Sequence, residues 1–361
     1  MLVETEIKLR IPPQMAERIT AHPLVNARLN GDWTRIELFN QYYDTEDLAL
    51  DRAALALRLR RDGDQVIQTL KGRGESIAGL SVRNEWDWYL QQETLSLHLL
   101  QTPELPEVLR HIDLDRLQPL FRTDFTRTKA ALCWQYQSEE VEIELALDRG
   151  EVVAGNTRAP LVELELELRR GPQQALLDFA LGLAENLPLQ PWDSAKAERG
   201  YRLIDPSRIP SLPPLRGWSL SQPAGQLMLA LAERLAARAV CSSERLYLDD
   251  SSSTQGLLQT LAQLSALIGL QSNLGLFSSK QKTVVENLRH ELESLQPEDV
   301  SAFRTVLEAD PNWGWMILSL ARLQLQPVAQ SVDGRTWLAA TQPRNQAQSA
   351  LIETISEGAD D

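Results

Sequence analysis

The sequence predicts an α+β protein with a β-rich N-terminal half and an all-helical C-terminal half. Two periodicities support this prediction. Runs that alternate apolar and polar residues recur through residues 1–205, which is the pattern of β-strands. From Leu220 onward, apolar residues recur at i, i+3, i+4 and i+7, as in amphipathic helices. Between them lies PSRIPSLPPLRGW (206–218), whose four prolines predict a stiff, extended linker.

Six alternating runs define the expected strands of the first half. They are VETEIKLR (3–10), ALALRLRR (54–61), VIQTLKGR (66–73), VRNEWDWYL (82–90), EVEIELALD (140–148) and VELELELRR (162–170). Glycine-containing turn signals separate several of them, including DGD (62–64) and DRGE (148–151). Two helices are expected among the strands: 12–23, which opens with prolines suited to a first helical turn, and 171–188, which closes with one.

The second half is expected to form one helical domain over residues 220–342, after a linker at 206–219. Its expected helices include 224–240, 254–270, 282–295, 300–309 and 312–326, each with an apolar stripe at helical spacing. The last segment, 343–361, is polar and acidic, so we expect a tail without stable structure.

Composition excludes several classes of protein. The formal net charge of −14 argues against nucleic-acid binding, which depends on neutralising phosphates with Lys and Arg. There is no stretch of 18 apolar residues to cross a membrane and no apolar signal core at the start. The two cysteines fall in different expected domains, which predicts reduced thiols and a cytoplasmic location.

The charged face of each strand carries mostly one sign. Acids cluster as Glu4/Glu6, Glu142/Glu144/Asp148 and Glu163/Glu165/Glu167, and bases cluster as Arg58/Arg60, Lys71/Arg73 and Arg127/Lys129. One reading is a sheet with a solvated charged face. However, a solvated face intersperses the two signs, whereas like charges on one face need compensation. A closed barrel would supply it, because the inward rows of different strands face one another.

The two groups of charges indicate a class of ligand. Carboxylates without Cys or clustered His favour Mg²⁺ or Mn²⁺, and Mg²⁺ lets phosphate complete its coordination shell. Arg and Lys recognise phosphate oxygens. Acids and bases in one interior therefore favour metal-assisted polyphosphate chemistry.

At these residues the sequence resembles the CYTH superfamily, also called triphosphate tunnel metalloenzymes. Its signature, E-x-E-x-K, is formed by Glu4, Glu6 and Lys8. Further motifs follow in order: YYDT (42–45), LRLR (57–60), TLK (69–71), VRNEW (82–86), FRTDFTR (121–127), EIELALDRGEV (142–152), ELELEL (163–168) and KAERGY (196–201). The set covers residues 1–205 and is most similar to the bacterial inorganic triphosphatase type, which joins a CYTH domain to a helical CHAD domain.

The resemblance implies an eight-stranded antiparallel β-barrel, closed into a tunnel that holds triphosphate and metal, with flanking helices. Carried over by motif, the expected metal ligands are Glu4, Glu6, Asp148, Glu163, Glu165 and Glu167, and which of the last three serve is left open. The expected phosphate-binding residues are Lys8, Arg58, Arg60, Lys71, Arg83, Arg127, Lys129 and Lys196, with Arg199 beside Lys196 on a terminal helix. The expected catalytic residues are Glu4, Glu6, Lys8 and Glu165. Glu85, Glu142 and Glu144 are expected to orient the bases by ion pairing, and a role of Glu142 or Glu144 as a metal ligand is left open.

The reaction that the resemblance implies is hydrolysis of inorganic triphosphate to pyrophosphate and phosphate with Mg²⁺, or Mn²⁺, as cofactor. Polyphosphate is a further expected ligand. Thiamine triphosphatase, class IV adenylate cyclase and a non-catalytic polyphosphate-binding protein are the alternatives. For residues 220–342 the resemblance implies a short, degenerate CHAD-like domain, since the Arg-His pair of that family is matched only by Arg289-His290.

Overall fold

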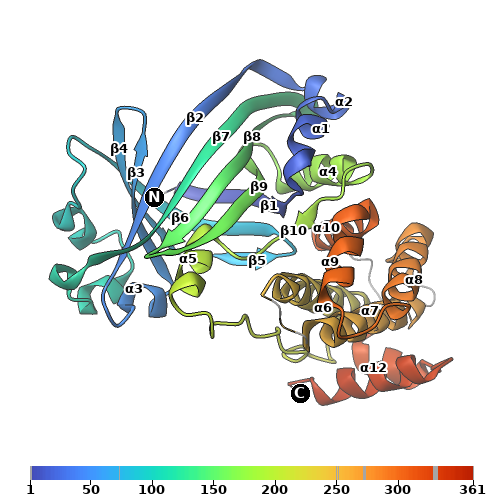
Figure 1. Ribbon diagram of the computed structural model, residues 1–361. Coiled ribbons are helices and arrows are strands. Elements are labelled where there is room, and N and C mark those ends of the chain that lie inside the picture. The colour runs from blue at the N-terminus through green and yellow to red at the C-terminus, as the bar shows by residue number, and fades with distance from the viewer. Residues whose placement is uncertain are drawn as a thin grey trace. The chain divides into compact units, whose positions relative to one another are not determined.

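The computed structural model describes residues 2–72, 74–248, 250, 252–270, 274–327 and 332–360 (Figure 1). The chain divides into two compact units. The first is formed by Met1–Ser76, Leu80–Leu176 and Ser194–Ile209, and the second by Ile77–Gly79, Leu177–Asp193 and Pro210–Asp361. The predicted domain limits of 205, 219 and 342 stay a prediction.

The first unit contains a closed antiparallel β-barrel of eight strands, which confirms the predicted fold class (Figure 1). In order around the ring the strands are β1 (Leu2–Arg10), β9 (Thr157–Arg170), β8 (Glu139–Ala154), β7 (Gln118–Tyr136), β2 (Leu29–Asp44), β3 (Leu55–Asp62), β4 (Gln65–Gly72) and β6 (Leu80–Leu90). The first strand closes the ring, because β1 pairs with β6 at Glu4↔Arg83 and with β9 at Lys8↔Glu165. Two further strands are short: β5 (Glu75–Ile77) and β10 (Gln190–Pro191), of which β10 falls in the second unit.

One glycine permits the close approach of two barrel strands. A Cβ atom at Gly150 on β8 would lie 2.1 Å from the carbonyl oxygen of Asp124 on β7. Glycine in a strand often marks such a position, since it has no side chain to hold the neighbouring backbone away.

The outer face of strands β3, β4 and β6 is apolar and covered. Leu57, Leu70 and Trp86 alternate with the charged residues of β3, β4 and β6 and belong to one buried cluster. Its cover comes from α3 (Ala49–Arg52) and three 3₁₀ turns, η2 (Leu97–Gln101), η3 (Glu107–His111) and η4 (Leu114–Arg116). A sheet that is buried on its outer face can turn its charged face only towards the interior.

Short helices follow the first strand, where the sequence predicts one helix over 12–23. They are η1 (Pro13–Met15), α1 (Ala16–Thr20) and α2 (Pro23–Asn26). The predicted helix 171–188 is α4 (Gln173–Ala184). The predicted terminal helix is α5 (Lys196–Ile204), whose Ala197 and Tyr201 pack with Tyr42 and Phe121 from the interior face of the barrel.

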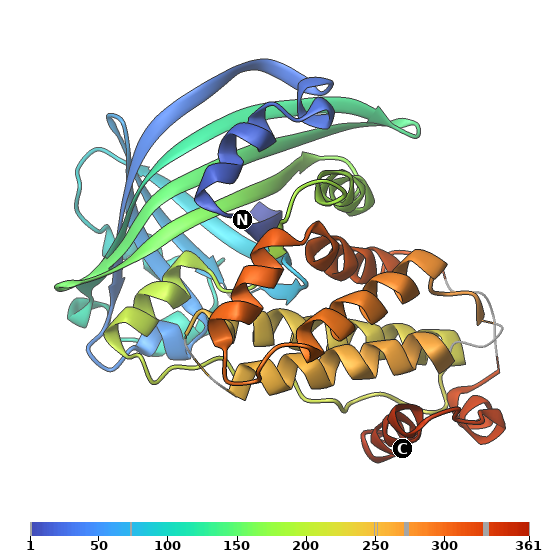
Figure 2. The same cartoon turned by 45° about the vertical axis from the view of Figure 1, so that its right-hand side comes forward.

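The second unit is helical, as predicted. Its helices are α6 (Ala224–Leu246), α7 (Ser252–Leu270), α8 (Ser279–Glu293), α9 (Val300–Ala309), α10 (Pro311–Leu323), α11 (Gly334–Ala340) and α12 (Gln346–Glu357). The long helices α6 and α7 lie side by side (Figures 1 and 2). Their leucine stripes are buried, as are Phe303 and Trp313 on the following helices. No helix of the part of the chain that the structure describes is long and apolar enough to cross a membrane.

The expectation of an unstructured tail over 343–361 is wrong, because α12 forms there. Its start is capped by Asn345, whose side chain accepts a hydrogen bond of 2.9 Å from the backbone nitrogen of Gln348. Leu351 and Ile355, one helical turn apart, are buried. The indole of Trp218 donates a hydrogen bond of 2.8 Å to the carbonyl of Ile355. The cap, the two buried apolar residues and the Trp218 hydrogen bond hold a segment whose composition is largely polar.

Candidate active site in the barrel interior

The charged rows of the strands point into the barrel. Lys71 on β4 pairs with Glu4 on β1, and Arg58 on β3 pairs with Glu85 on β6. In each case one strand lies between the partners. Since successive side chains alternate between the two faces of a sheet, residues that reach across a strand must share a face. The interior of the barrel is therefore lined by acids and bases.

One group of charges surrounds Glu4 of the E-x-E-x-K motif. Its carboxylate accepts hydrogen bonds from Lys71 Nζ at 2.8 and 3.0 Å and from Arg83 Nε at 2.7 Å. Arg83 also contacts Glu6, and Lys71 also lies 3.1 Å from Glu85. Burial alone would raise the pKa of Glu4, but Lys71 and Arg83 hold it well below its usual range. Glu4 is therefore a charged anchor for two bases.

A second group lies around three carboxylates that we call the acidic triad: Asp148 on β8 and Glu163 and Glu165 on β9. One ligand oxygen of each lies within 4.8 Å of the others. Register explains the meeting, because Asp148 is paired directly with Glu163, and Glu165 follows on the same face. Asp148 and Glu163 are at most 1% exposed. Such a set of hard oxygen donors fits a divalent cation like Mg²⁺.

Basic side chains hold the triad together in this structure. Arg127 on β7 donates two hydrogen bonds of 2.7 Å to Asp148 and one of 2.5 Å to Glu165. Lys196 on α5 contacts all three carboxylates. Burial alone would raise the pKa of Glu165, but Lys196, Arg127 and Lys8 hold it well below its usual range. Glu165 is thus held in its ionised form, which suits a group that contacts cations.

A third group contains Glu144 and Glu167. Lys129 donates a hydrogen bond of 3.0 Å to Glu144, and Arg169 lies 3.2 Å from Glu144 and 2.5 Å from Glu167. Burial raises the pKa of Glu167 to about 7, helped by the charge of Glu4 and only partly opposed by Arg169. The third acid of ELELEL is therefore set apart from the triad in place, and its pKa is shifted in the opposite direction to that of Glu165.

Arg60 is the interior base that is best placed to receive an anion. Its Nε donates a hydrogen bond of 2.8 Å to the amide oxygen of Asn40. No carboxylate among the described residues forms an ion pair with it. Burial lowers the pKa of Arg60 to about 10, and the like charges of Arg58 and Arg127 add to the effect. A guanidinium so placed stays charged at neutral pH, and no described carboxylate neutralises it by direct contact.

The structure brings together some of the predicted metal ligands and separates others. Asp148, Glu163 and Glu165 form the triad, whereas Glu4 and Glu6 lie with Lys71 and Arg83, and Glu167 lies with Arg169. The predicted phosphate-binding residues on β1, β3, β4, β6, β7 and α5 all belong to the interior set. Lys8 is 2% exposed and lies 3.6 Å from Glu6. Arg73 lies outside the described residues.

Two contacts of functional interest were not expected from the sequence. Tyr201 donates a hydrogen bond of 2.8 Å to Asp44, which joins the tyrosine of KAERGY to the acid of YYDT. Asn40 accepts the hydrogen bond from Arg60 that is described above. Both involve strand β2, where Asn40 lies two residues before the Tyr-Tyr-Asp-Thr motif. The sequence signal for Asn40 was its spacing of two residues from Tyr42, which places both side chains on the same face of a strand.

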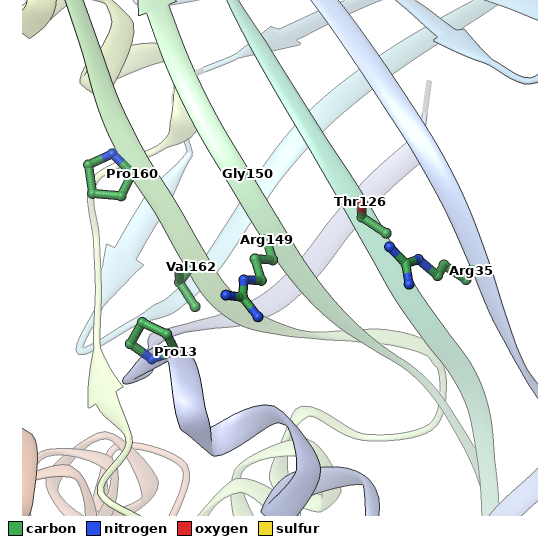
Figure 3. A pocket seen from close by; sticks show the side chains of 7 residues that line it. All are labelled: Pro13, Arg35, Thr126, Arg149, Gly150, Pro160 and Val162. Carbon is green, nitrogen blue, oxygen red and sulfur yellow. The ribbon is translucent and has the colours of Figure 1, made fainter.

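A hollow of about 570 Å³ lies on the outer side of the barrel wall (Figure 3). It is lined by Pro13, Arg35, Thr126, Arg149, Gly150, Pro160 and Val162. Arg35 and Arg149 are exposed, and Thr126 precedes the inward-facing Arg127. The lining contains no carboxylate among the described residues, so this hollow does not share the chemistry of the interior.

Fold and site together define a closed β-barrel protein whose interior is built from paired acids and bases. The model of the CYTH domain family matches residues 2–201, and this chain belongs to that family. The resemblance inferred from the ordered motifs is thus confirmed for the first half of the chain. A CHAD-like second domain stays a prediction.

Two kinds of relatives are similar to this chain. An inorganic triphosphatase of Haemophilus influenzae is 32% identical over 203 residues, which cover 56% of this chain and 55% of that protein. The chain thus spans about half the length of that curated relative. A solved Hippeastrum protein with a dominant triphosphatase activity is 20% identical, with 56% of this chain and 98% of that chain covered and a TM-score of 0.39. A solved inorganic triphosphatase is 18% identical, with 49% of this chain and 80% of that chain covered and a TM-score of 0.21.

Proposed function

We propose that this protein is a metal-dependent hydrolase that splits inorganic triphosphate into pyrophosphate and phosphate. The observation that carries the proposal is the meeting, inside one closed barrel, of a three-carboxylate cluster and a guanidinium that has no carboxylate partner in the part of the chain that the structure describes. The triad suits a divalent cation and Arg60 suits a phosphate oxygen. The similarity to an inorganic triphosphatase over the same residues supports this substrate.

The acidic triad is the best candidate for the metal site. Asp148, Glu163 and Glu165 would hold Mg²⁺ or Mn²⁺, with Glu4, Glu6 and Glu167 as further candidates from the motif. A bound divalent ion would supply charge neutralisation on phosphate oxygens and a water of lowered pKa. The lowered pKa of Glu165 suits a ligand that stays ionised.

The bases of the interior would bind and orient the triphosphate. Arg58 and Arg60 lie two residues apart on one face of β3, and a phosphate oxygen between them would relieve their mutual repulsion. Lys8, Lys71, Arg83, Arg127, Lys129 and Lys196 complete the proposed phosphate-binding set. Lys8, from the same strand as Glu4 and Glu6, would stabilise negative charge on the transferring group. We assign no covalent nucleophile.

The remaining assignments rest on sequence alone. Polyphosphate as a second ligand, a CHAD-like role of the helices, the lack of nucleic-acid binding and a cytoplasmic location are proposed on that basis. The net charge of −14 disfavours binding to nucleic acid. It does not prevent the bases of the interior from binding a small phosphate, because a concave site can hold a field opposite to the net charge.

A substrate panel tests the proposal. Tripolyphosphate, ATP and thiamine triphosphate are each offered with Mg²⁺ and with Mn²⁺, and phosphate release is measured. We expect tripolyphosphate to be preferred and Glu163→Gln to lower turnover by at least 100-fold. The control, Glu353→Gln on the exposed face of α12, should match the parent. Preference for either of the other substrates would replace the proposed substrate, and tight tripolyphosphate binding without turnover would identify a non-catalytic binding protein.

A further inference from the structure

Lys196 occupies the centre of the acidic triad. Its Nζ lies 2.7 Å from Asp148 Oδ2 and 2.8 Å from Glu165 Oε1, and it also contacts Glu163. The side chain is 7% exposed, so water contributes little to its solvation. The ammonium therefore takes the place among three carboxylates that a divalent cation would need.

The charges of this group already balance without any metal. Three carboxylates, those of Asp148, Glu163 and Glu165, contact three cationic side chains, those of Arg127, Lys196 and Arg199. A divalent ion that entered with all three bases in place would create a buried excess of positive charge. Buried charges are costly unless they are paired. Entry of the metal therefore requires that a base leaves the triad.

Lys196 is the base that can leave. Arg127 is fixed on strand β7 of the barrel wall and is paired bidentately with Asp148. Lys196 instead stands at the first residue of α5, at the end of a flexible stem with three rotatable donors. It also contacts more members of the triad than Arg127 or Arg199 does. Its departure frees the largest number of ligand oxygens.

The helix that carries Lys196 is itself held in place. The backbone nitrogen of Ala195 donates a hydrogen bond of 2.9 Å to Glu198 Oε2, which fixes the first turn. One turn later, the hydroxyl of Tyr201 is bonded to Asp44. With its helix anchored, the ammonium can change partners by rotation of its stem and remain in the interior.

We propose that Lys196 is a tethered counter-ion, which neutralises the acidic triad in the metal-free protein and is displaced from it by a divalent metal. The displaced ammonium then becomes available to an anion in the same interior. This last consequence rests on the proposed function, because it is triphosphate that would receive the charge. Metal and triphosphate would therefore bind cooperatively. The metal would free the ammonium of Lys196 to pair with triphosphate, and triphosphate would stabilise the displaced ammonium that metal binding requires.

Direct metal titration of the full chain tests the proposal. Mn²⁺ is titrated in the absence of phosphates, and its binding is followed by isothermal calorimetry and by the electron spin resonance of free Mn²⁺. We expect Lys196→Met to bind Mn²⁺ at least tenfold more tightly than the parent. Lys129→Met is the matched control, since it removes the same charge from the interior beside Glu144 and is expected to change affinity less than threefold.

An unchanged or weaker Mn²⁺ affinity of Lys196→Met would overturn the proposal, as would an equal gain in Lys129→Met. If the variant does not fold, the parent protein carries the test through the ¹⁵N resonances of its lysine ammonium groups. Addition of Mg²⁺ should shift the resonance of one strongly protected ammonium, and no shift would overturn the proposal. The Mn²⁺ titration contains no triphosphate, so its result is independent of the substrate panel. If the parent protein hydrolyses tripolyphosphate but Lys196→Met binds Mn²⁺ no more tightly than the parent, only this inference is rejected. If Lys196→Met shows the expected gain in Mn²⁺ affinity but the parent protein is inactive on every substrate, only the proposed function is rejected.

Discussion

The hydroxyl of Tyr201 on α5 donates a hydrogen bond of 2.8 Å to Asp44 Oδ2 at the end of β2. The same buried carboxylate also accepts bonds from the backbone nitrogens of Thr45, Leu50 and Asp51. Asp44 thus joins the barrel, the short helix α3 and the terminal helix. It is a positioning residue, because α5 is the element that brings Lys196 to the acidic triad.

Tyr201→Phe removes this link while preserving the ring that packs on Phe121. We expect a loss of about 1–3 kcal/mol in the free energy of unfolding, because Asp44 loses a buried donor. Tripolyphosphate turnover should fall as well, since α5 loses its anchor. Urea unfolding followed by tryptophan fluorescence measures the first effect. Tyr89→Phe is the control, because that side chain is 73% exposed, and its stability should stay within about 0.5 kcal/mol of the parent.

Gly200→Ala tests the contact between α5 and the barrel. In an ordinary helix this change stabilises by about 1 kcal/mol. Here the new Cβ atom would lie 2.1 Å from the ring of Phe121, so we expect a net loss of about 1–3 kcal/mol. Gly256→Ala in α7 is the matched control, since its nearest neighbour would be Ser242 Oγ at 3.4 Å. Equal stabilisation of both variants in urea would show that α5 does not press on Phe121.

Arg60→Gln separates ligand binding from stability. Because Asn40 is its hydrogen-bond partner and its charged neighbours repel it, its loss should leave the free energy of unfolding unchanged or slightly higher. The affinity for tripolyphosphate should fall about 10- to 100-fold with the lost charge-assisted bonds. Arg127→Gln should instead destabilise by about 3–5 kcal/mol, since it leaves buried carboxylates unpaired. Calorimetric titration and urea unfolding of both variants provide the comparison.

Glu167 predicts a specific pH dependence of stability. Its pKa of about 7 in the folded protein lies above the ordinary 4.5 of a glutamate. The folded state therefore holds the proton more tightly, and this residue costs stability progressively as pH rises from about 4.5 to about 7. Glu167→Gln should be neutral at pH 4 and stabilising by about 1–3 kcal/mol at pH 8. Thermal unfolding at both pH values checks this, and a gain of equal size at both would contradict the assigned pKa.

The architecture of the first half was predictable because its signal is local. Alternation in Glu4-Thr5-Glu6-Ile7-Lys8 and in ELELEL shows which side chains share a face within one strand. β2 lies outside the strands that alternation predicts, since polar residues such as Asp32, Thr34 and Arg35 occupy both of its faces. Only the YYDT motif indicated that this segment belongs to the fold.

The membership of the metal site was less predictable, because it depends on register between strands that are distant in sequence. Glu163, Glu165 and Glu167 are equivalent in the sequence, yet Asp148 is paired with Glu163 and Glu144 with Glu167. That offset places Glu163 and Glu165 in the triad and Glu167 beside Arg169. The choice of Lys196 as the cation of the triad likewise needs the position of α5, which no periodicity encodes.

The proposed metal and phosphate sites are tested most directly by the anomalous difference map of a crystal that contains Mn²⁺ and tripolyphosphate. We expect a manganese peak at the oxygens of Asp148, Glu163 and Glu165, with phosphate density inside the barrel against Arg58 and Arg60. Manganese and phosphate bound only outside the barrel, in a crystal of protein that is active on tripolyphosphate, would contradict this proposal.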